Sequence, residues 1–162
     1  MKLDEQWAAL EVADVELHDA RLNWLCQESA VVLGQQPAGY INQACEDWAT
    51  TKAAYRFFGN TKKVTPTGIS APHQQRTVER ISQHPLLLAV QGTTFFNYRH
   101  HPNTEWLGEI SNRKQQQRGF GLHSTVAVTP AGVPLGTLTQ QFITRPLGEP
   151  AHTPSELQQL PI

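Results

Sequence analysis

The spacing of apolar residues along the first half of the chain predicts a series of helices. Within Asp19–Leu33, apolar side chains recur every three or four positions and so share one helix face. A second helix is predicted over Asp47–Phe58, because an aspartate at its start can accept hydrogen bonds from free backbone N–H groups. A third helical region is expected over Thr65–Gln83, and Pro72 should kink or restart it.

The same spacing predicts which side chains are buried. In the second helix the residues expected to share the buried face are Trp48, Thr51, Tyr55 and Phe58. In the third region, Val78 and Ile81 are expected to form the apolar side.

After residue 85 the pattern changes to that of strands. The run Leu86–Gln91 has the length and content of a buried strand that ends at Gln91. Residues 119–129 and 133–144 are rich in β-branched residues and flank the turn sequence Pro130-Ala131-Gly132, which predicts a hairpin. The order of helices followed by three strands predicts an α+β fold. The proline-rich stretch 147–162 is expected to be a loosely held tail.

Composition and cysteine usage narrow the class of protein. The chain has 162 residues, of which 39% are apolar, and its longest apolar run is too short to cross a bilayer. Cys26 and Cys45 lack the spacing of a metal site, and we interpret them as reduced core thiols of a cytoplasmic protein rather than as a disulfide.

Charge is distributed unevenly along the chain. Residues 1–51 carry two Lys/Arg against nine acidic residues, whereas residues 52–80 carry six Lys/Arg against Glu79 alone. The middle of the chain is therefore either a phosphate-binding surface or a set of solvated helix faces, and charge alone favours the second.

Several blocks of sequence, in unbroken order, resemble the Tn5-type transposases of the IS4 group. "INQACEDWATTKAAYRFFGNTKKVTPTGISAPH" is similar to their N-terminal DNA-binding domain, and "ELHDARLNWL" fits their opening helix. "LLLAVQGTTFFNYRHHP" and "GFGLHSTVAVTPAGVPLGTLTQQFITRP" resemble the start of their RNase H-like catalytic domain. The resemblance implies a helical DNA-binding domain over residues 1–84 and an incomplete RNase H-like domain of three strands over residues 85–146.

The resemblance also implies a mechanism that this chain is expected to lack. The family holds two Mg²⁺ ions with two Asp and one Glu, and the first Asp lies at the tip of the first strand. Here Gly92 occupies that position, and we expect the segments that would bring the other two carboxylates to be absent. A lost aspartate is one interpretation of Gly92; a glycine needed for a bulge or a close backbone approach is the other. No catalytic residue, cofactor or resident metal is therefore predicted.

The basic residues near the second helix are the candidate DNA contacts. Lys52 and Arg56 are one helical turn apart, and the resemblance places "YRF" in the DNA-contacting domain. The full predicted set is Arg21, Lys52, Tyr55, Arg56, Lys62, Lys63 and Arg76. The alternative is solvated charge, with Tyr55 and Phe58 in the core.

Two further groups of residues invite a functional interpretation that we do not favour. His100, His101 and His123 lack the spacing of a metal site. Trp48 and Trp106 are expected to be a core residue and a loop anchor, not platforms for stacking bases.

The predicted function is recognition of double-stranded DNA at transposon ends by a catalytically inactive, monomeric, transposase-derived protein. Two alternatives stay open: a remnant with no activity, and an inhibitor that occupies DNA ends or pairs with a full-length transposase. A third, an enzyme completed by a second polypeptide, is disfavoured because Gly92 would still leave the first metal ligand absent.

Overall fold

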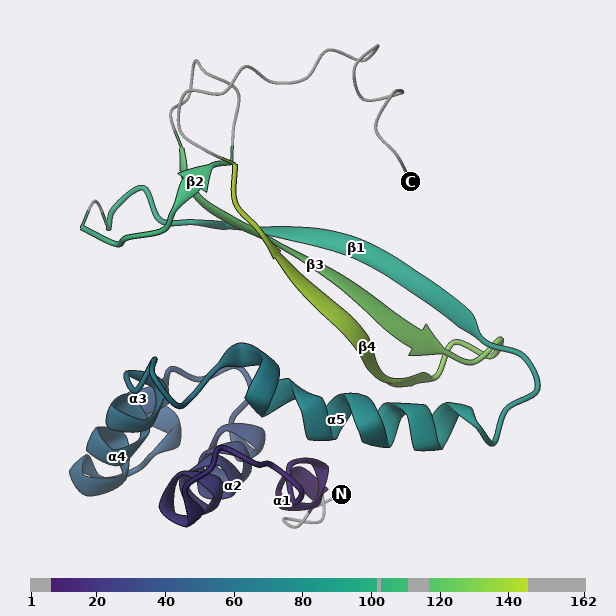
Figure 1. The fold of residues 1–162 in the computed structure, drawn as a ribbon, viewed down its shortest axis with the longest axis horizontal. Coiled ribbons are helices and arrows are strands. Elements are labelled where there is room, and N and C mark those ends of the chain that lie inside the picture. The colour runs from purple at the N-terminus through teal and green to yellow at the C-terminus, as the bar shows by residue number, and fades with distance from the viewer. Residues whose placement is uncertain (1–6, 102, 111–116, 146–162) are drawn as a thin grey trace. The chain divides into compact units, whose positions relative to one another are not determined.

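The computed structural model describes residues 7–101, 103–110 and 117–145, and the predicted tail 147–162 lies outside these ranges. The described helices come first along the chain: α1 (Trp7–Glu11), α2 (Ala20–Gln35), α3 (Ile41–Ala44), α4 (Trp48–Phe58) and α5 (Pro66–Ile81). The described strands follow: β1 (Leu88–Asn97), β2 (Gly108–Glu109), β3 (Arg118–Val128) and β4 (Pro134–Ile143) (Figure 1). The predicted α+β class is confirmed. No helix in the described ranges is long and apolar enough to cross a membrane.

Side-chain caps fix where the three longest helices begin. Asp19 accepts a hydrogen bond from the backbone N–H of Arg21 and starts α2. Asp47 accepts from the N–H groups of Ala49 and Thr50, which confirms it as the cap of α4. The Thr65 hydroxyl accepts a hydrogen bond from the backbone N–H of Gly68 and starts α5, with Pro66 at the first helical position.

The structure rules out one predicted helix end and one of the two effects predicted for Pro72. The first helix does not end at Leu33, because α2 continues to Gln35. Pro72 does not restart the third helix, because α5 runs unbroken from Pro66 to Ile81. Pro72 is buried there, so its ring contributes to packing.

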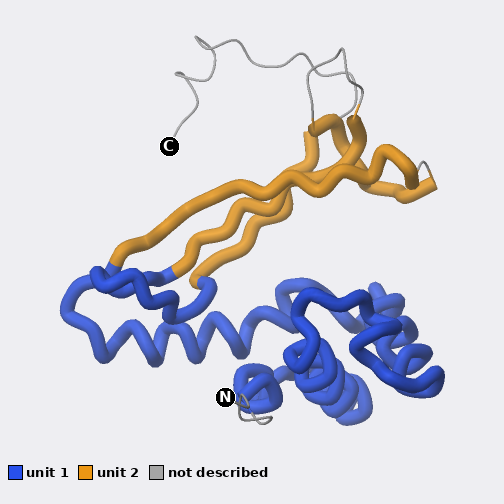
Figure 2. Tube along the Cα trace, turned by 180° about the vertical axis from the view of Figure 1, so that it is seen from behind, with its two compact units in different colours: residues 1–87, 127–137 blue, residues 88–126, 138–162 orange. Residues whose placement is uncertain are grey.

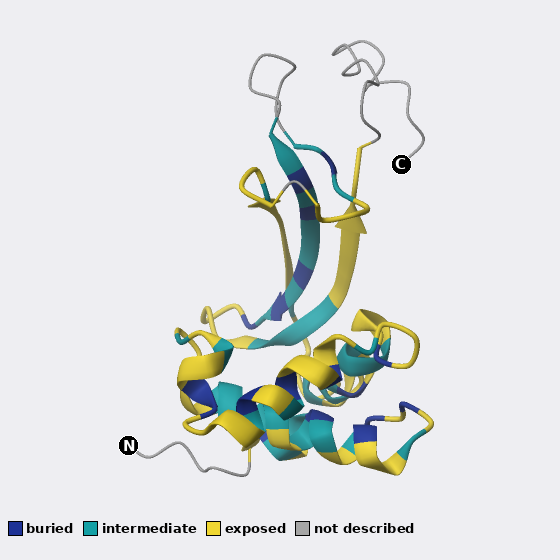
Figure 3. Ribbon diagram, turned by 90° about the vertical axis from the view of Figure 1, so that its left-hand side faces the viewer, coloured by how far each residue is buried: buried dark blue, intermediate teal, exposed yellow. Residues whose placement is uncertain are grey.

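The core of the helical part is a single cluster of apolar side chains. Phe57 is 1% exposed and is the largest side chain in it. Residues of α2, of α5 and of the connections between helices surround it: Val12, Val15, Leu17, Leu22, Cys26 and Val64, with Leu25, Ala30 and Ile69 packed against them. Figure 3 marks the buried positions along the ribbon in dark blue. Cys26 and Cys45 are both buried and free.

The predicted inward faces of α4 and α5 are partly wrong. Thr51 of α4 is buried as expected, but its buried partners are Ala54 and Phe57. Trp48, Tyr55 and Phe58 are 75%, 56% and 39% exposed. The helix face that was predicted to be buried is therefore not the face that α4 packs against the core. Both faces carry aromatic residues, so the spacing alone does not distinguish them. In α5, Val78 is exposed, while Pro72 and Thr77 are buried.

The strands form one sheet in which β3 is central. β1, β2 and β4 all pair with β3, and β2 does so antiparallel through Gly108 and Gly119. The two residues of β2 add a fourth strand that the sequence did not predict. β1 and β3 are also antiparallel. Tyr98 N donates to Arg118 O at 2.7 Å, and Thr93 Oγ1 lies 2.8 Å from His123 Nδ1, so residue numbers fall along β1 as they rise along β3.

The predicted hairpin between β3 and β4 is confirmed. Thr129 N donates to Val133 O, and Gly132 N donates to Thr129 O, each at 2.9 Å. Gly132 has φ 84°, a conformation that glycine adopts without steric cost. Aromatic rings then extend across the strands, with Phe120 stacked on Phe96 at 4.9 Å between ring centroids and 5.7 Å from Phe142.

The first strand differs from its prediction in two ways. β1 does not end at Gln91 but continues to Asn97, so Gly92 is inside the strand and not at its tip. Every residue of β1 is exposed, so the strand is not buried. Its apolar side chains, Leu88, Val90, Phe95 and Phe96 among them, contact solvent instead of a second layer.

The chain divides into two compact units (Figure 2). The first comprises residues 1–87 and 127–137, and the second comprises residues 88–126 and 138–162. We call the first the helical unit. It includes the turn between β3 and β4, although this turn is distant from the helices in sequence.

Candidate nucleic-acid interface

The outward face of α4 presents basic and aromatic side chains together. The helix buries Thr51, Ala54 and Phe57, so the residues between them face outward. Lys52, Tyr55 and Arg56 are all exposed, and Lys52 and Arg56 are one turn apart. Within the described part of the chain, neither cation has an acidic partner. We call Lys52, Tyr55 and Arg56 the α4 outer face.

Arg21 lies next to this face across a groove. Arg21 is exposed in the first turn of α2 and has no acidic partner among the described residues. The groove has a volume of ≈ 460 Å³, and Arg21 and Arg56 both line it. The other lining residues are Ala20, Trp24, Leu25 and Ala53. The structure thus brings together two predicted DNA contacts that are 35 residues apart in sequence.

The two lysines after α4 differ in their surroundings. Lys62 is exposed and unpaired within the described residues. Lys63 Nζ lies 3.0 Å from Asp19 Oδ2, which attaches the turn after α4 to the start of α2. Hydrogen bonds from Lys63 and from the backbone N–H of Arg21 lower the pKa of Asp19 below its ordinary value. Lys63 would have to leave this carboxylate to contact a phosphate.

The basic residues of α5 are also engaged with acidic side chains. Arg76 Nη2 lies 2.8 Å from Asp14 Oδ2, and the Arg76 side chain is only 28% exposed. Arg80 donates to both carboxylate oxygens of Glu11, at 2.6 and 3.1 Å. Three of the six cations in residues 52–80, Lys63, Arg76 and Arg80, are therefore paired with acidic residues. The other three, Lys52, Arg56 and Lys62, have no acidic partner in the described part of the chain.

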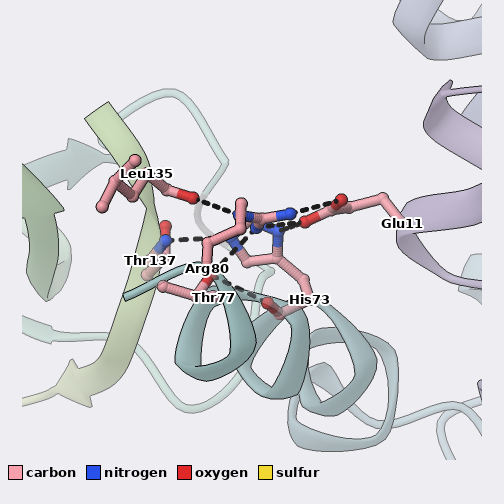
Figure 4. Close-up of polar contacts among 6 residues, drawn as sticks. All are labelled: Glu11, His73, Thr77, Arg80, Leu135 and Thr137. Carbon is pink, nitrogen blue, oxygen red and sulfur yellow. Dashed lines mark hydrogen bonds and ion pairs between the residues drawn. The ribbon is translucent and has the colours of Figure 1, made fainter. Parts of the chain in front are cut away.

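Arg80 is the centre of a polar network within the helical unit (Figure 4). It donates to Leu135 O at 2.6 Å, which holds the start of β4 against α5. The Glu11 carboxylate also lies 2.6 Å from His73 Nδ1, and the backbone N–H of Thr137 donates to His73 Nε2 at 2.9 Å. Because Nε2 accepts, the proton of a neutral His73 is on Nδ1 and points to Glu11.

Glu11 is ionised by this network despite its partial burial. Burial alone would raise the pKa of Glu11, but hydrogen bonds from Arg80 and His73, with the attraction of the Arg80 guanidinium, outweigh it. The net effect is a pKa below the ordinary value of 4.5. Gly136 makes the close approach of β4 possible, because a Cβ at this residue would collide with Thr77 Oγ1.

The region around Gly92 has the geometry of an open strand surface. A Cβ built at Gly92 meets nothing within 4 Å, so no close approach requires a glycine there. Among the described residues, no three His, Cys, Asp or Glu side chains are grouped so that they could hold a metal ion. His123 contacts Thr93, and the ring of His101 packs against Tyr98 at 5.9 Å.

Comparison with known families adds an independent line of evidence. Residues 4–63 match the family described as transposase DNA-binding. The match spans α1 to α4 and the turn that follows, and it supports a transposase-derived DNA-binding domain in this part of the chain. All of the predicted DNA contacts except Arg76 lie within it.

Sequence reasoning missed one residue of this surface. Trp24 is 58% exposed and lines the groove between Arg21 and Arg56. Its signal was available, because Trp24 falls outside the apolar stripe that contains Leu22, Leu25 and Cys26. Trp48 and Trp106, at 75% and 89% exposed, are neither a core residue nor a buried anchor, contrary to the prediction.

Proposed function

We propose that this protein binds double-stranded DNA at transposon ends through the α4 outer face, with Arg21 and Lys62 as additional contacts. One observation carries the proposal: exposed cations that have no acidic partner among the described residues gather on α4, inside the region that matches transposase DNA-binding domains. Lys63 and Arg76 remain predicted contacts, of smaller expected weight because each is already paired with an aspartate.

The side chains of this surface suit different parts of a duplex. Lys52 and Lys62 are point charges that match backbone phosphates, which provide affinity without sequence information. Arg56 has a planar group of donors that can address a phosphate or the edge of a guanine. Tyr55 combines an apolar ring with a hydroxyl donor. Sequence preference in this proposal therefore depends chiefly on Arg56 and Tyr55.

Binding to labelled duplexes tests the proposal. The full chain is titrated into a transposon-end duplex and into a scrambled duplex of equal length and composition, at several salt concentrations. We expect tighter binding to the end sequence and an affinity that falls steeply with salt. Absence of binding at low salt would overturn the proposal, and equal binding to both duplexes would overturn recognition of the end.

We further propose that the chain descends from an IS4-group transposase and does not cleave DNA. The domain division is residues 1–84 for DNA binding, 85–146 for an incomplete RNase H-like domain and 147–162 for a tail. Gly92 supports this proposal, because its open surroundings leave room for the aspartate of the parent family and give no packing reason for glycine. The free cysteines support a cytoplasmic location.

The exposed sheet favours a second candidate function. β1 carries apolar side chains that are 39–61% exposed within the described part of the chain. This feature fits an inhibitor that pairs with a full-length transposase, and it equally fits a decayed remnant. Co-purification with the transposase of the same element distinguishes them, since a remnant would neither pair with it nor reduce its activity.

A further inference from the structure

The groove beside the α4 outer face is charged at one end and apolar at the other. Arg21 and Arg56 line its wider part, of ≈ 460 Å³. A narrower, mainly apolar slot of ≈ 100 Å³ continues between α2 and α4. Val32, Leu33 and Ala54 are among its lining residues, and Glu28 is the acidic residue among them. Trp24, Leu25 and Ala53 line both parts, so the groove and the slot adjoin at the Trp24 side chain.

A single nucleotide has the same division of chemistry. Its phosphate is anionic and suits two arginines, and its base is a flat apolar ring that stacks on tryptophan. Stacking on Trp24 needs the face of a base, whereas a paired base inside a duplex offers only its edges in the grooves. A concave site of this size therefore fits an unpaired base better than a continuous duplex.

We propose that this groove binds one unpaired nucleotide at the end of a bound DNA duplex. The base stacks on Trp24, and its phosphate lies between Arg21 and Arg56. The small side chains of Ala20 and Ala53 leave the space that the base occupies. The inference rests on the proposed DNA binding, and it adds a preference for ends that carry an unpaired base.

Three duplexes of the same sequence test this inference. One is blunt, one carries a single-nucleotide overhang, and one carries an abasic overhang that keeps the phosphate but lacks the base. We expect the natural protein to bind the overhang several-fold more tightly than the blunt or the abasic end. Trp24→Ala should lose about tenfold in affinity for the overhang and less than about twofold for the blunt end.

Trp48→Ala is the matched control, because Trp48 is an exposed tryptophan on α4 that does not line the groove. It should leave the overhang preference intact, and Trp24→Phe should keep part of it. Equal binding to blunt and overhang ends, or equal losses in the two alanine variants, would overturn the inference while leaving duplex binding in place. If the protein bound none of the three duplexes, the proposed function would be overturned as well.

Discussion

The helical unit and the sheet differ in how each buries its apolar side chains. In the helical unit, Phe57 and Cys26 are 1% and 3% exposed, and residues distant in sequence pack around them. In the sheet, Val90, Phe95 and Phe142 are 52%, 61% and 53% exposed. The buried positions of β3 include Gly119, Gly121 and Thr125, which are too small to form a core of their own.

The two regions are therefore stabilised by different interactions. The helical unit has a closed core, capped helices and an ion-pair network, so its own contacts account for its fold. The sheet depends on its ladder and on the aromatic contacts around Phe120. Among the described residues, the apolar side chains of β1 stay exposed. Substitutions in the helical unit should therefore cost far more stability than matched substitutions in the sheet.

The largest expected effect is that of Phe57→Ala. Removal of a fully buried ring should lower the free energy of unfolding by about 3–5 kcal/mol. The matched variant is Phe95→Ala, which removes a ring that is 61% exposed and should cost under about 1 kcal/mol. Urea unfolding followed by helical circular dichroism measures both, and equal losses would show that the two regions do not differ as described.

Arg80→Ala should have the next largest effect. Arg80 bonds to the Glu11 carboxylate and to Leu135 O, so its removal leaves a partly buried carboxylate with less compensation. We expect a loss of about 2 kcal/mol in the same urea experiment. Glu79→Ala, at the exposed neighbouring position of α5, is the control and should be nearly neutral. An Arg80→Ala protein as stable as the natural one would show that the network does not stabilise the helical unit.

The pH dependence of stability should report on Glu11. Its pKa in the folded state lies below the ordinary value of 4.5, so the stabilisation that it provides is complete above that value. It is lost as the pH falls through the lowered pKa, when the carboxylate takes up a proton. Glu11→Gln should therefore show a shallower loss of stability than the natural protein below about pH 4.5. If Glu11→Gln and the natural protein lost stability equally steeply at low pH, the ionised Glu11 would not be a source of this pH dependence.

The smallest expected effect is that of Gly92→Asp. Because a side chain at residue 92 meets nothing within 4 Å, the free energy of unfolding should change by less than about 0.5 kcal/mol. Restoring this aspartate alone should not restore cleavage, because our proposal assigns no residue of this chain to the other two carboxylates of the family's metal site. Nicking of plasmid DNA by the variant with Mg²⁺ or Mn²⁺ would show that catalytic groups have been overlooked.

Local chemistry explains which features could be predicted from sequence. The cap Asp47 and the hairpin around Gly132 depend on a few neighbouring residues, and both were predicted correctly. The stripe buried by α4 was not, because Tyr55 and Phe57 are on different faces and the sequence alone does not say which aromatic contacts the core. The pairing of Glu11 with Arg80 spans 69 residues and depends on the tertiary fold.

The candidate site was predictable in part for the same reason. Lys52 and Arg56 share a helix face by spacing alone, so they were identified together. The groove that joins Arg56 to Arg21 forms only when α2 packs beside α4, and Trp24 becomes a groove residue only then. The engagement of Lys63 and Arg76 by Asp19 and Asp14 is likewise invisible without the fold.

The salt dependence of DNA binding tests the central claim most directly. Two double variants remove the same charge: Lys52→Ala with Arg56→Ala from the α4 outer face, and Lys63→Ala with Arg76→Ala from the ion pairs. The first should weaken duplex binding by at least about tenfold and reduce the salt slope by about two, since each lost phosphate contact removes about 0.9. The second should stay within about threefold of the natural protein. Equal losses in the two folded variants, or a larger loss in the second, would contradict binding through the α4 outer face.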